Sequence, residues 1–114
     1  AAAEASADKT WSLDELMARG EQVYTKACAA CHQANGQGVP NVFPGLAGSA
    51  IATGDIAAHM DIVLNGKAGT AMQAFGPQLN DLELAAVITY ERNAWGNETG
   101  DMVQPADVAA SRNK

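Results

Sequence analysis

The segment Cys28-Ala29-Ala30-Cys31-His32 decides how this chain folds and what it carries. Its spacing, C-x-x-C-H, is the attachment signature of a c-type haem. Two thiols at this separation can form thioether bonds with the two vinyl groups of the porphyrin, and the histidine that follows can ligate the iron from one side. The sequence therefore predicts one covalently attached haem c, held by Cys28, Cys31 and the axial ligand His32.

Other uses of a cysteine pair explain this segment less well. A bare disulfide gives the adjacent histidine no purpose. A thioredoxin-like pair follows a strand and opens a helix, whereas here a helical pattern comes before the cysteines and a glycine-rich stretch comes after them. A zinc site would need two more ligands, and His59 is the obvious candidate for one of them. A chance occurrence of the pattern is the fourth alternative.

The composition indicates one small domain whose protein core is thin. The chain has 114 residues, of which 47% are hydrophobic, but alanine supplies much of that share and there are only two Phe, two Tyr and two Trp. Such side chains bury little apolar area for a domain of this size. A buried macrocycle would supply the missing core, so we expect the chain without haem to be largely unfolded.

The charge balance excludes some classes of function. Seven basic and thirteen acidic residues give a net charge of −6, which disfavours binding to nucleic acid. The longest apolar runs are far shorter than a membrane span, and the first residues lack the pattern of a signal peptide. Because haem attachment normally takes place outside the cytoplasm, we expect a periplasmic location and a chain that is either mature or cut from a longer one.

Local patterns place three helices. A capping box formed by Ser12 and Glu15 predicts a helix over residues 13–28. Asp55 can cap a second helix, which Asn65-Gly66 would close. A further capping-box pattern, which begins at Asn80, predicts a third helix that reaches about residue 93. The fold class expected is all-α, with three to five helices and loops wrapped around the haem.

The remaining stretches lack a clear period. Residues 1–11 are predicted to be a flexible linker, and residues 12–96 the folded domain. Residues 33–48 contain four glycines together with Pro40 and Pro44, which predicts a loop. Residues 97–114 are polar and weakly patterned, and we expect an irregular C-terminal tail.

The opposite face of the iron needs a sixth ligand, and Met72 is the favoured candidate. It lies in the aperiodic segment 69–75, where small flanking residues would let the backbone approach a flat ring. Met17 and Met60 fall on apolar helix faces, where they serve packing, and Met102 lies in the expected tail. His59 is expected to be partly exposed, or hydrogen-bonded to a propionate or a backbone group.

These features together resemble the class I cytochrome c fold, over nearly the whole of residues 13–95. The resemblance implies that the carbonyl of Pro44, twelve residues after His32, accepts a hydrogen bond from the Nδ1 of that histidine. Such a bond would set the tautomer of the imidazole and strengthen the iron–nitrogen bond. Leu46, Phe75 and Tyr24 are predicted to line the haem pocket beside Pro44.

The same resemblance assigns a helix crossing. Gly20 and Tyr24 match the glycine and the aromatic residue of the family's first helix, and Val87 and Tyr90 match their partners on its last helix. A missing side chain at Gly20 would let the two helices approach closely. At Gln73 the chain departs from the family, which commonly has a proline after its methionine.

A closer similarity concerns four stretches of the chain: residues 11–24, 35–46, 69–76 and 89–101. They resemble the cytochrome c domain that is fused to subunit II of caa-type cytochrome c oxidases, where it follows a cupredoxin domain with a binuclear copper centre. This implies an excised C-terminal domain, monomeric in isolation. It would accept electrons from a donor cytochrome and pass them to the copper-containing domain of a membrane-bound oxidase.

Two other functions remain open at this point. A free-standing soluble periplasmic carrier would share all of this chemistry. A haem peroxidase or a small-ligand sensor would need a distal histidine or arginine over the iron, and residues 66–75 contain neither. Electron transfer without catalysis is therefore the expected role of the domain.

Overall fold

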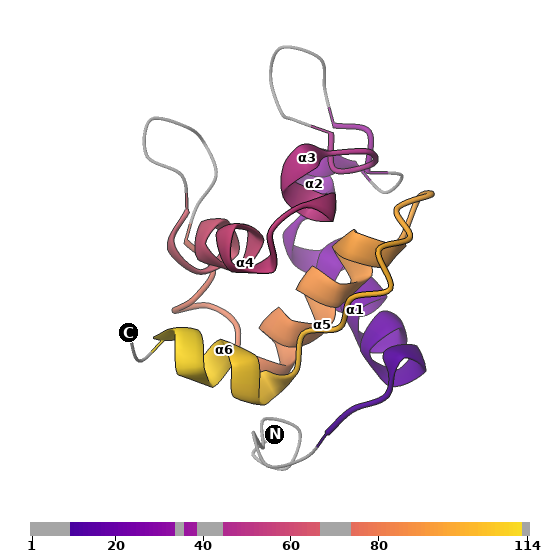
Figure 1. Cartoon of the computed structure of the whole chain (residues 1–114). Coiled ribbons are helices and arrows are strands. Elements are labelled where there is room, and N and C mark those ends of the chain that lie inside the picture. The colour runs from indigo at the N-terminus through magenta and orange to yellow at the C-terminus, as the bar shows by residue number, and fades with distance from the viewer. Residues whose placement is uncertain (1–9, 34–35, 39–44, 67–73, 113–114) are drawn as a thin grey trace.

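The computed structural model describes residues 10–33, 36–38, 45–66 and 74–112, and within them it contains helices and no strand (Figure 1). Four helices have eight residues or more: α1 (Leu13–Ala27), α4 (Ile56–Asn65), α5 (Asp81–Asn93) and α6 (Pro105–Arg112). Two single turns, α2 (Ala29–His32) and α3 (Ala50–Thr53), lie between α1 and α4. The all-α class predicted from the sequence is confirmed. None of the described helices is long and apolar enough to cross a membrane.

The helix starts follow the capping patterns in the sequence. Ser12 accepts a hydrogen bond from the backbone of Glu15, whose side chain accepts one from the backbone of Ser12. Asn80 begins α5 with the same reciprocal arrangement, and Asp55 caps α4. Gly66 ends α4 with a φ of +74°, a left-handed conformation that glycine adopts without strain. These four boundaries agree with the sequence prediction.

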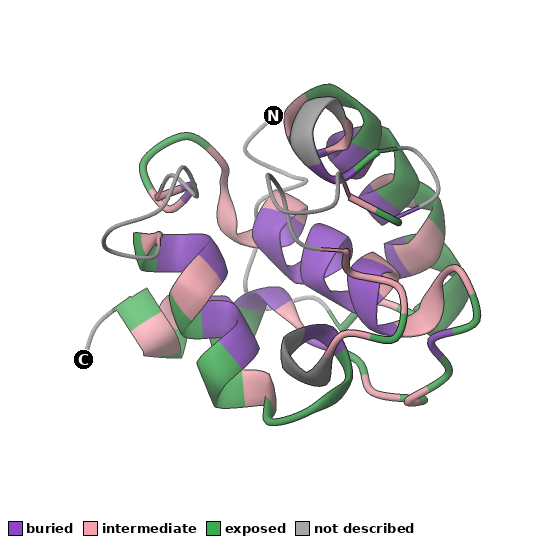
Figure 2. Cartoon of the chain, turned by 90° about the horizontal axis from the view of Figure 1, so that it is seen from above, coloured by how far each residue is buried: buried purple, intermediate pink, exposed green. Residues whose placement is uncertain are grey.

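Helices α1 and α5 cross closely and form the centre of the molecule. A Cβ atom on Gly20 would overlap the carbonyl oxygen of Ala86 and lie 2.6 Å from the Cβ of Tyr90. The crossing therefore admits only glycine at this position of α1. Helix α5 is buried along most of its length, from Leu82 to Arg92 (Figure 2).

The C-terminal segment differs from the expected irregular tail, and that prediction is wrong for α6. Val103 and Val108 are completely buried, and Val103 N donates to the Thr89 hydroxyl of α5 at 2.9 Å. Gln104 forms two hydrogen bonds with the backbone of Trp11, at 2.8 and 2.9 Å. A few apolar residues in a polar stretch give little periodicity, but here they cover the side of α5 that α1 leaves open.

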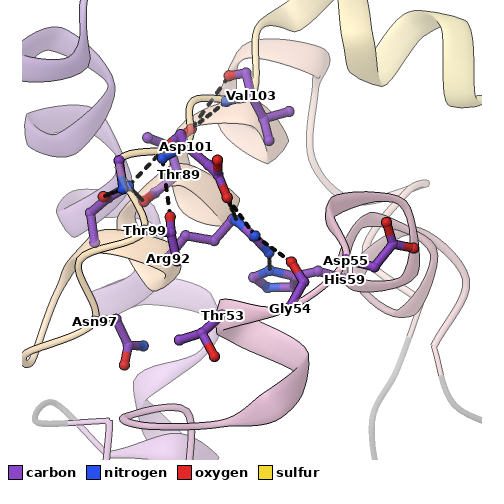
Figure 3. Close-up of polar contacts among 12 residues, drawn as sticks. Thr53, Gly54, Asp55, His59, Thr89, Arg92, Asn97, Thr99, Asp101 and Val103 are labelled. Atoms are coloured by element: carbon purple, nitrogen blue, oxygen red, sulfur yellow. Dashed lines mark hydrogen bonds and ion pairs between the residues drawn. The ribbon is translucent and has the colours of Figure 1, made fainter.

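A buried polar network joins α4, α5 and the segment before α6 (Figure 3). The guanidinium of Arg92, whose side chain is 1% exposed, donates to Asp101 at 2.6 Å and to the carbonyl of Gly54. Its Nη1 lies 3.4 Å from the Nδ1 of His59, whose Nε2 lies 2.8 Å from the carboxylate of Glu91. Because arginine can only donate, Nδ1 accepts, and the ring proton on Nε2 is directed at Glu91.

The position of His59 corrects the sequence prediction. Its side chain is 2% exposed, so it is not partly exposed, and its partners are the Glu91 and Arg92 side chains rather than a propionate or the backbone. The inward face of α4 carries His59 against α5, and a buried imidazole in that position needs polar partners.

We predict that Gly20→Leu destabilises the domain by about 1–3 kcal/mol, because the added side chain must push α1 away from α5. Urea unfolding of the holoprotein measures the change. Ala18→Leu is the matched control, since Ala18 is exposed on the same helix. Equal stability of the two variants would contradict the role assigned to Gly20.

A second prediction concerns Asp101, whose pKa is held below its usual range by hydrogen bonds from Arg92. A carboxylate with a lowered pKa in the folded state stabilises the protein above its unfolded pKa of about 3.9 and loses this effect as the pH falls through the folded value. Asp101→Asn should therefore be less stable than the wild type at neutral pH, and the difference should narrow below about pH 4.

Urea unfolding at a series of pH values tests this prediction. Glu98→Gln serves as the control, because it neutralises an exposed carboxylate in the same segment. A stability difference between wild type and Asp101→Asn that stays constant across the pH series would show that the ion pair with Arg92 contributes nothing.

Candidate haem site

The haem-attachment segment forms a sharp corner after α1. Cys28 ends α1, and its N–H donates to the carbonyl of Tyr24 at 2.9 Å. The chain continues directly into the single turn α2, in which His32 N donates to the carbonyl of Cys28 at 3.0 Å. Gln33 ends this turn with a φ of +68°. Residues three and four apart lie on one side of a helical turn, and Cys28 and His32 are four residues apart across this corner. Haem attachment through Cys28 and Cys31 and ligation by His32 stay predictions.

The surroundings of this corner fit a large apolar ring. Cys28 and His32 expose only 7% and 8% of their surfaces. Cys28 belongs to the hydrophobic core cluster, which also includes Met60 and Phe75, and Leu46 packs against it. A thiol in an apolar cluster and a nearby buried imidazole are the groups that thioether attachment and axial ligation of haem require. The side chain of Cys31 lies outside the described part of the chain.

Tyr24 connects this corner to the helix crossing. Its hydroxyl donates to the carbonyl of Gln33 at 2.6 Å, which holds the chain directly after His32 against α1. Its ring packs against Tyr90 and Trp95, with centroid distances of 5.6 and 4.9 Å. Tyr90 and Trp95 meet edge to face at 5.4 Å, so the three rings form one cluster.

The environment keeps these phenols protonated. Burial, and then the negative charge of Glu91, raises the pKa of Tyr24 well above its usual range. The pKa of Tyr90 is raised as well, first by burial and then by the charge of Glu21. Tyr24 can therefore donate its hydrogen bond to Gln33 throughout the neutral and mildly alkaline range.

Gly36 and Asn97 contact described residues on both sides of the corner's following segment, and neither was predicted from the sequence as a site residue. Gly36 has a φ of +70°, and a Cβ on it would come within 2.5 Å of the ring of Trp95. The buried side chain of Asn97 donates to the carbonyl of Leu46 at 2.9 Å and accepts from the N–H of Gly48 at 2.7 Å. The glycine-rich stretch 35–38 could have indicated that Gly36 adopts a positive φ. No pattern in the sequence distinguishes Asn97 from the other polar residues of the C-terminal segment.

The residues predicted for the site are placed as follows. Tyr24, Phe75 and Val87 belong to the core cluster that contains Cys28, and Leu46 and Tyr90 pack against it. Gly20 lies at the helix crossing against Ala86 and Tyr90. Pro44 and Met72 fall outside the described residues, so the hydrogen bond from His32 to Pro44 and the ligation by Met72 stay predictions.

The other candidates for the sixth ligand have different surroundings. Both ring nitrogens of His59 are engaged, one with Glu91 and one with Arg92. Met60 is buried within the core cluster, and Met17 is half-buried on α1. Met102 is 45% exposed in the segment before α6. In addition, the described residues contain no group of three or more His, Cys, Asp or Glu that could hold a separate metal ion.

Comparison with known proteins gives one matching family and several similar proteins. Residues 15–90 match the family model described as "Cytochrome C oxidase, cbb3-type, subunit III". The chain is 36% identical over 113 residues to the gluconate 2-dehydrogenase cytochrome c subunit of Pantoea cypripedii, which covers 90% of this chain and 25% of the relative. It is 33% identical over 103 residues to the cytochrome c subunit of the alcohol dehydrogenase (quinone) of Gluconobacter oxydans, with 82% and 22% covered.

A third relative is similar in size to this chain. Cytochrome c-552 of Thermus thermophilus is 36% identical over 94 residues, which cover 70% of each protein. By contrast, the chain spans about a quarter of the length of the two dehydrogenase subunits. The family match, the similarity to cytochrome c-552 and the burial of Cys28 and His32 agree. The chain belongs to the cytochrome c family matched by the cbb3-type subunit III model, and it is an electron-transfer domain with a covalently bound haem c.

Proposed function

We propose that this domain accepts electrons from a donor cytochrome and passes them to the copper centre of subunit II in a membrane-bound terminal oxidase, on the periplasmic side of a bacterial membrane. The observation that carries the choice of electron transfer over catalysis is the engagement of His59. A peroxidase or ligand sensor needs a free distal base, but both nitrogens of this imidazole are bound to Glu91 and Arg92 inside the protein.

The proposed roles of the haem-binding residues follow from the corner. Cys28 and Cys31 would hold the group by thioether bonds, with His32 and Met72 as axial ligands and the Pro44 carbonyl orienting His32. When bound, haem supplies a one-electron couple between Fe(III) and Fe(II). If His32 and Met72 both hold the iron, the group would be left without a position for a substrate, and little would have to rearrange when its charge changes.

The protein around the corner supports such a rigid carrier. The Tyr24 hydroxyl holds Gln33, and Asn97 holds both Leu46 and Gly48. These bonds connect Gln33 to α1, and they connect Leu46 and Gly48 to the segment that follows α5. Fixed surroundings keep the reorganisation small during electron transfer, which favours a carrier over an enzyme that must admit a substrate.

Two observations support the oxidase as the parent complex. The four stretches named above resemble the cytochrome c domain of caa-type oxidase subunit II, and the matching family model is itself described by an oxidase subunit. The similarity to two dehydrogenase cytochrome c subunits supports a second candidate, a haem module of a periplasmic dehydrogenase complex. A free-standing carrier, similar in size to cytochrome c-552, is the third.

The parent reading frame distinguishes these candidates. We expect it to encode two transmembrane helices and a cupredoxin domain with a copper-binding cysteine pair ahead of this domain. Further C-x-x-C-H segments in the same frame would favour the dehydrogenase module, and a frame that encodes a signal peptide and this domain alone would favour the free carrier. Either of these results would overturn the oxidase assignment.

We further predict that Met72→Ala leaves the haem attached but removes the low-spin His/Met spectrum of the oxidised protein. Because a thioether ligand favours Fe(II), the reduction potential should fall by on the order of 0.1 V or more, within the range of about 0.8 V that axial ligands span. Absorption spectra and a redox titration measure both effects. Met102→Ala, at an exposed position, is the control and should behave like the wild type. A methionine-ligated spectrum that survives in Met72→Ala would move the assignment to Met60 or Met102.

A further inference from the structure

Gln33, the residue directly after His32, has a backbone conformation that residues other than glycine rarely adopt. Its φ is +68° and its ψ is 155°. This combination is essentially restricted to glycine, and another residue stays in it only where the surrounding structure holds it there. The side chain of Gln33 is exposed, so burial of that side chain does not hold the conformation. The constraint therefore comes through the backbone.

Hydrogen bonds reach both backbone polar groups of Gln33. Its N–H donates to the carbonyl of Ala29 at 2.8 Å and so closes the turn α2. Its carbonyl accepts from the N–H of Gly36 at 3.0 Å and from the hydroxyl of Tyr24 at 2.6 Å. The bonds with Ala29 and Gly36 join neighbours in the sequence, which move with the turn. The bond from Tyr24 connects Gln33 to α1.

The ring of Tyr24 gives its hydroxyl a fixed position. Tyr24 is buried, and its ring contacts the rings of Tyr90 and Trp95. The indole of Trp95 also lies against Gly36, where a Cβ would come within 2.5 Å of it. Side chains in a close-packed interior have little freedom to move. The hydroxyl is therefore a donor that stays in place at the Gln33 carbonyl.

The same stretch of backbone fixes the peptide of His32. The N–H of His32 donates to the carbonyl of Cys28 at 3.0 Å, and the carbonyl of His32 accepts from the N–H of Gly38 at 2.9 Å. Because φ and ψ are the soft dihedral angles of a residue, those of Gln33 decide how the turn with His32 is oriented against residues 36–38. A change of φ at Gln33 to an ordinary negative value would turn His32 away from its present position and weaken the bond from Gly38.

We propose that Tyr24 is a positioning residue for the haem ligand His32: its hydroxyl holds Gln33 in the glycine-like conformation that fixes the His32 peptide. This inference rests on the proposed role of His32 as an axial ligand. Without the hydroxyl, the strain at Gln33 is no longer offset by a bond from α1. A form with a relaxed Gln33 and a displaced His32 then becomes more populated, while both cysteines still hold the haem.

Tyr24→Phe in the holoprotein tests the inference, because it removes the hydroxyl and keeps the ring. Amide hydrogen exchange of Gly38 reports the bond to the His32 carbonyl, and we expect it to become about fivefold faster, a factor that corresponds to the loss of one hydrogen bond. In the oxidised protein, the unpaired electron shifts the NMR resonances of the axial ligands, and those of the His32 ring should move. Exchange and ring resonances like those of the wild type would overturn the proposal.

Gln33→Gly separates positioning from general support of the fold. Glycine adopts a positive φ without strain, so little strain is left for the hydroxyl to offset in this variant. Gln33→Gly alone should therefore resemble the wild type, and the double variant Tyr24→Phe/Gln33→Gly should regain most of the wild-type exchange rate and ring resonances. A double variant that differs from the wild type as much as Tyr24→Phe does would refute the role of the strained backbone, and with it the proposal.

Tyr90→Phe is the matched control, because it removes another hydroxyl of the three-ring cluster, one that forms a hydrogen bond with the side chain of Trp95. It should leave the exchange of Gly38 and the His32 resonances unchanged, even if urea unfolding shows a loss of stability. Equal effects of Tyr90→Phe and Tyr24→Phe would reduce the result to packing of the cluster and contradict the positioning role.

Isotope labelling of histidine distinguishes failure of this inference from failure of the proposed ligand. His32 and His59 are the two histidines of the chain, and assignment of the labelled rings shows which of them carries the shifted resonances. If it is His32 and Tyr24→Phe leaves its resonances in place, the ligand assignment stands and the positioning role is refuted. If it is His59, the ligand assignment fails, and with it the effect of Tyr24 on the haem. The exchange of Gly38 in Tyr24→Phe then shows whether the hydroxyl holds the backbone: a wild-type rate would refute that part too.

Discussion

The close approach of α1 and α5 at Gly20 is the contact on which the rest of the structure depends. The backbone of Ala86 occupies the space that a side chain on Gly20 would need. This crossing sets the direction of α1, and α1 ends at Cys28, where the haem-attachment turn begins. The crossing also fixes the position of α5, and α5 packs against every other described helix except the single turn α2. A displacement of α1 at the crossing would therefore also displace Cys28 at the end of the same helix.

Polar side chains of α5, and of the segment after it, place the surrounding loops. Arg92 and Glu91 bind His59 and so hold α4, Thr89 binds Val103 and so holds the approach to α6, and Asn97 holds Leu46 and Gly48. Large apolar side chains are few in this chain, and a thin core gives little resistance to sliding. Buried hydrogen bonds are directional, so they fix the position of each helix more tightly than apolar contacts can. Such a frame suits a domain that must keep its cofactor still while its charge changes.

Features encoded within a few neighbouring residues were predictable. The capping boxes at Ser12 and Asn80, the cap at Asp55 and the end of α4 at Gly66 agree with the sequence prediction, because each involves backbone groups at most four residues away. The all-α class followed from the helical periods, and the covalent haem c that the cytochrome c family carries followed from the C-x-x-C-H spacing. The first helix ends at Ala27, one residue before the predicted end at residue 28.

Long-range partners were not predictable. His59 was expected near the surface, yet it is buried because Glu91 and Arg92, 32 and 33 residues away, surround it. Residues 97–114 were expected to be irregular, yet Val103 and Val108 bury completely against α5, and Arg112 reaches residues 31 to 36 positions earlier. The sequence by itself determined the helix ends, the haem attachment and the glycine of the crossing. Only the tertiary structure decided which polar side chains meet, because a charged residue carries no local mark of the partner that folding brings to it.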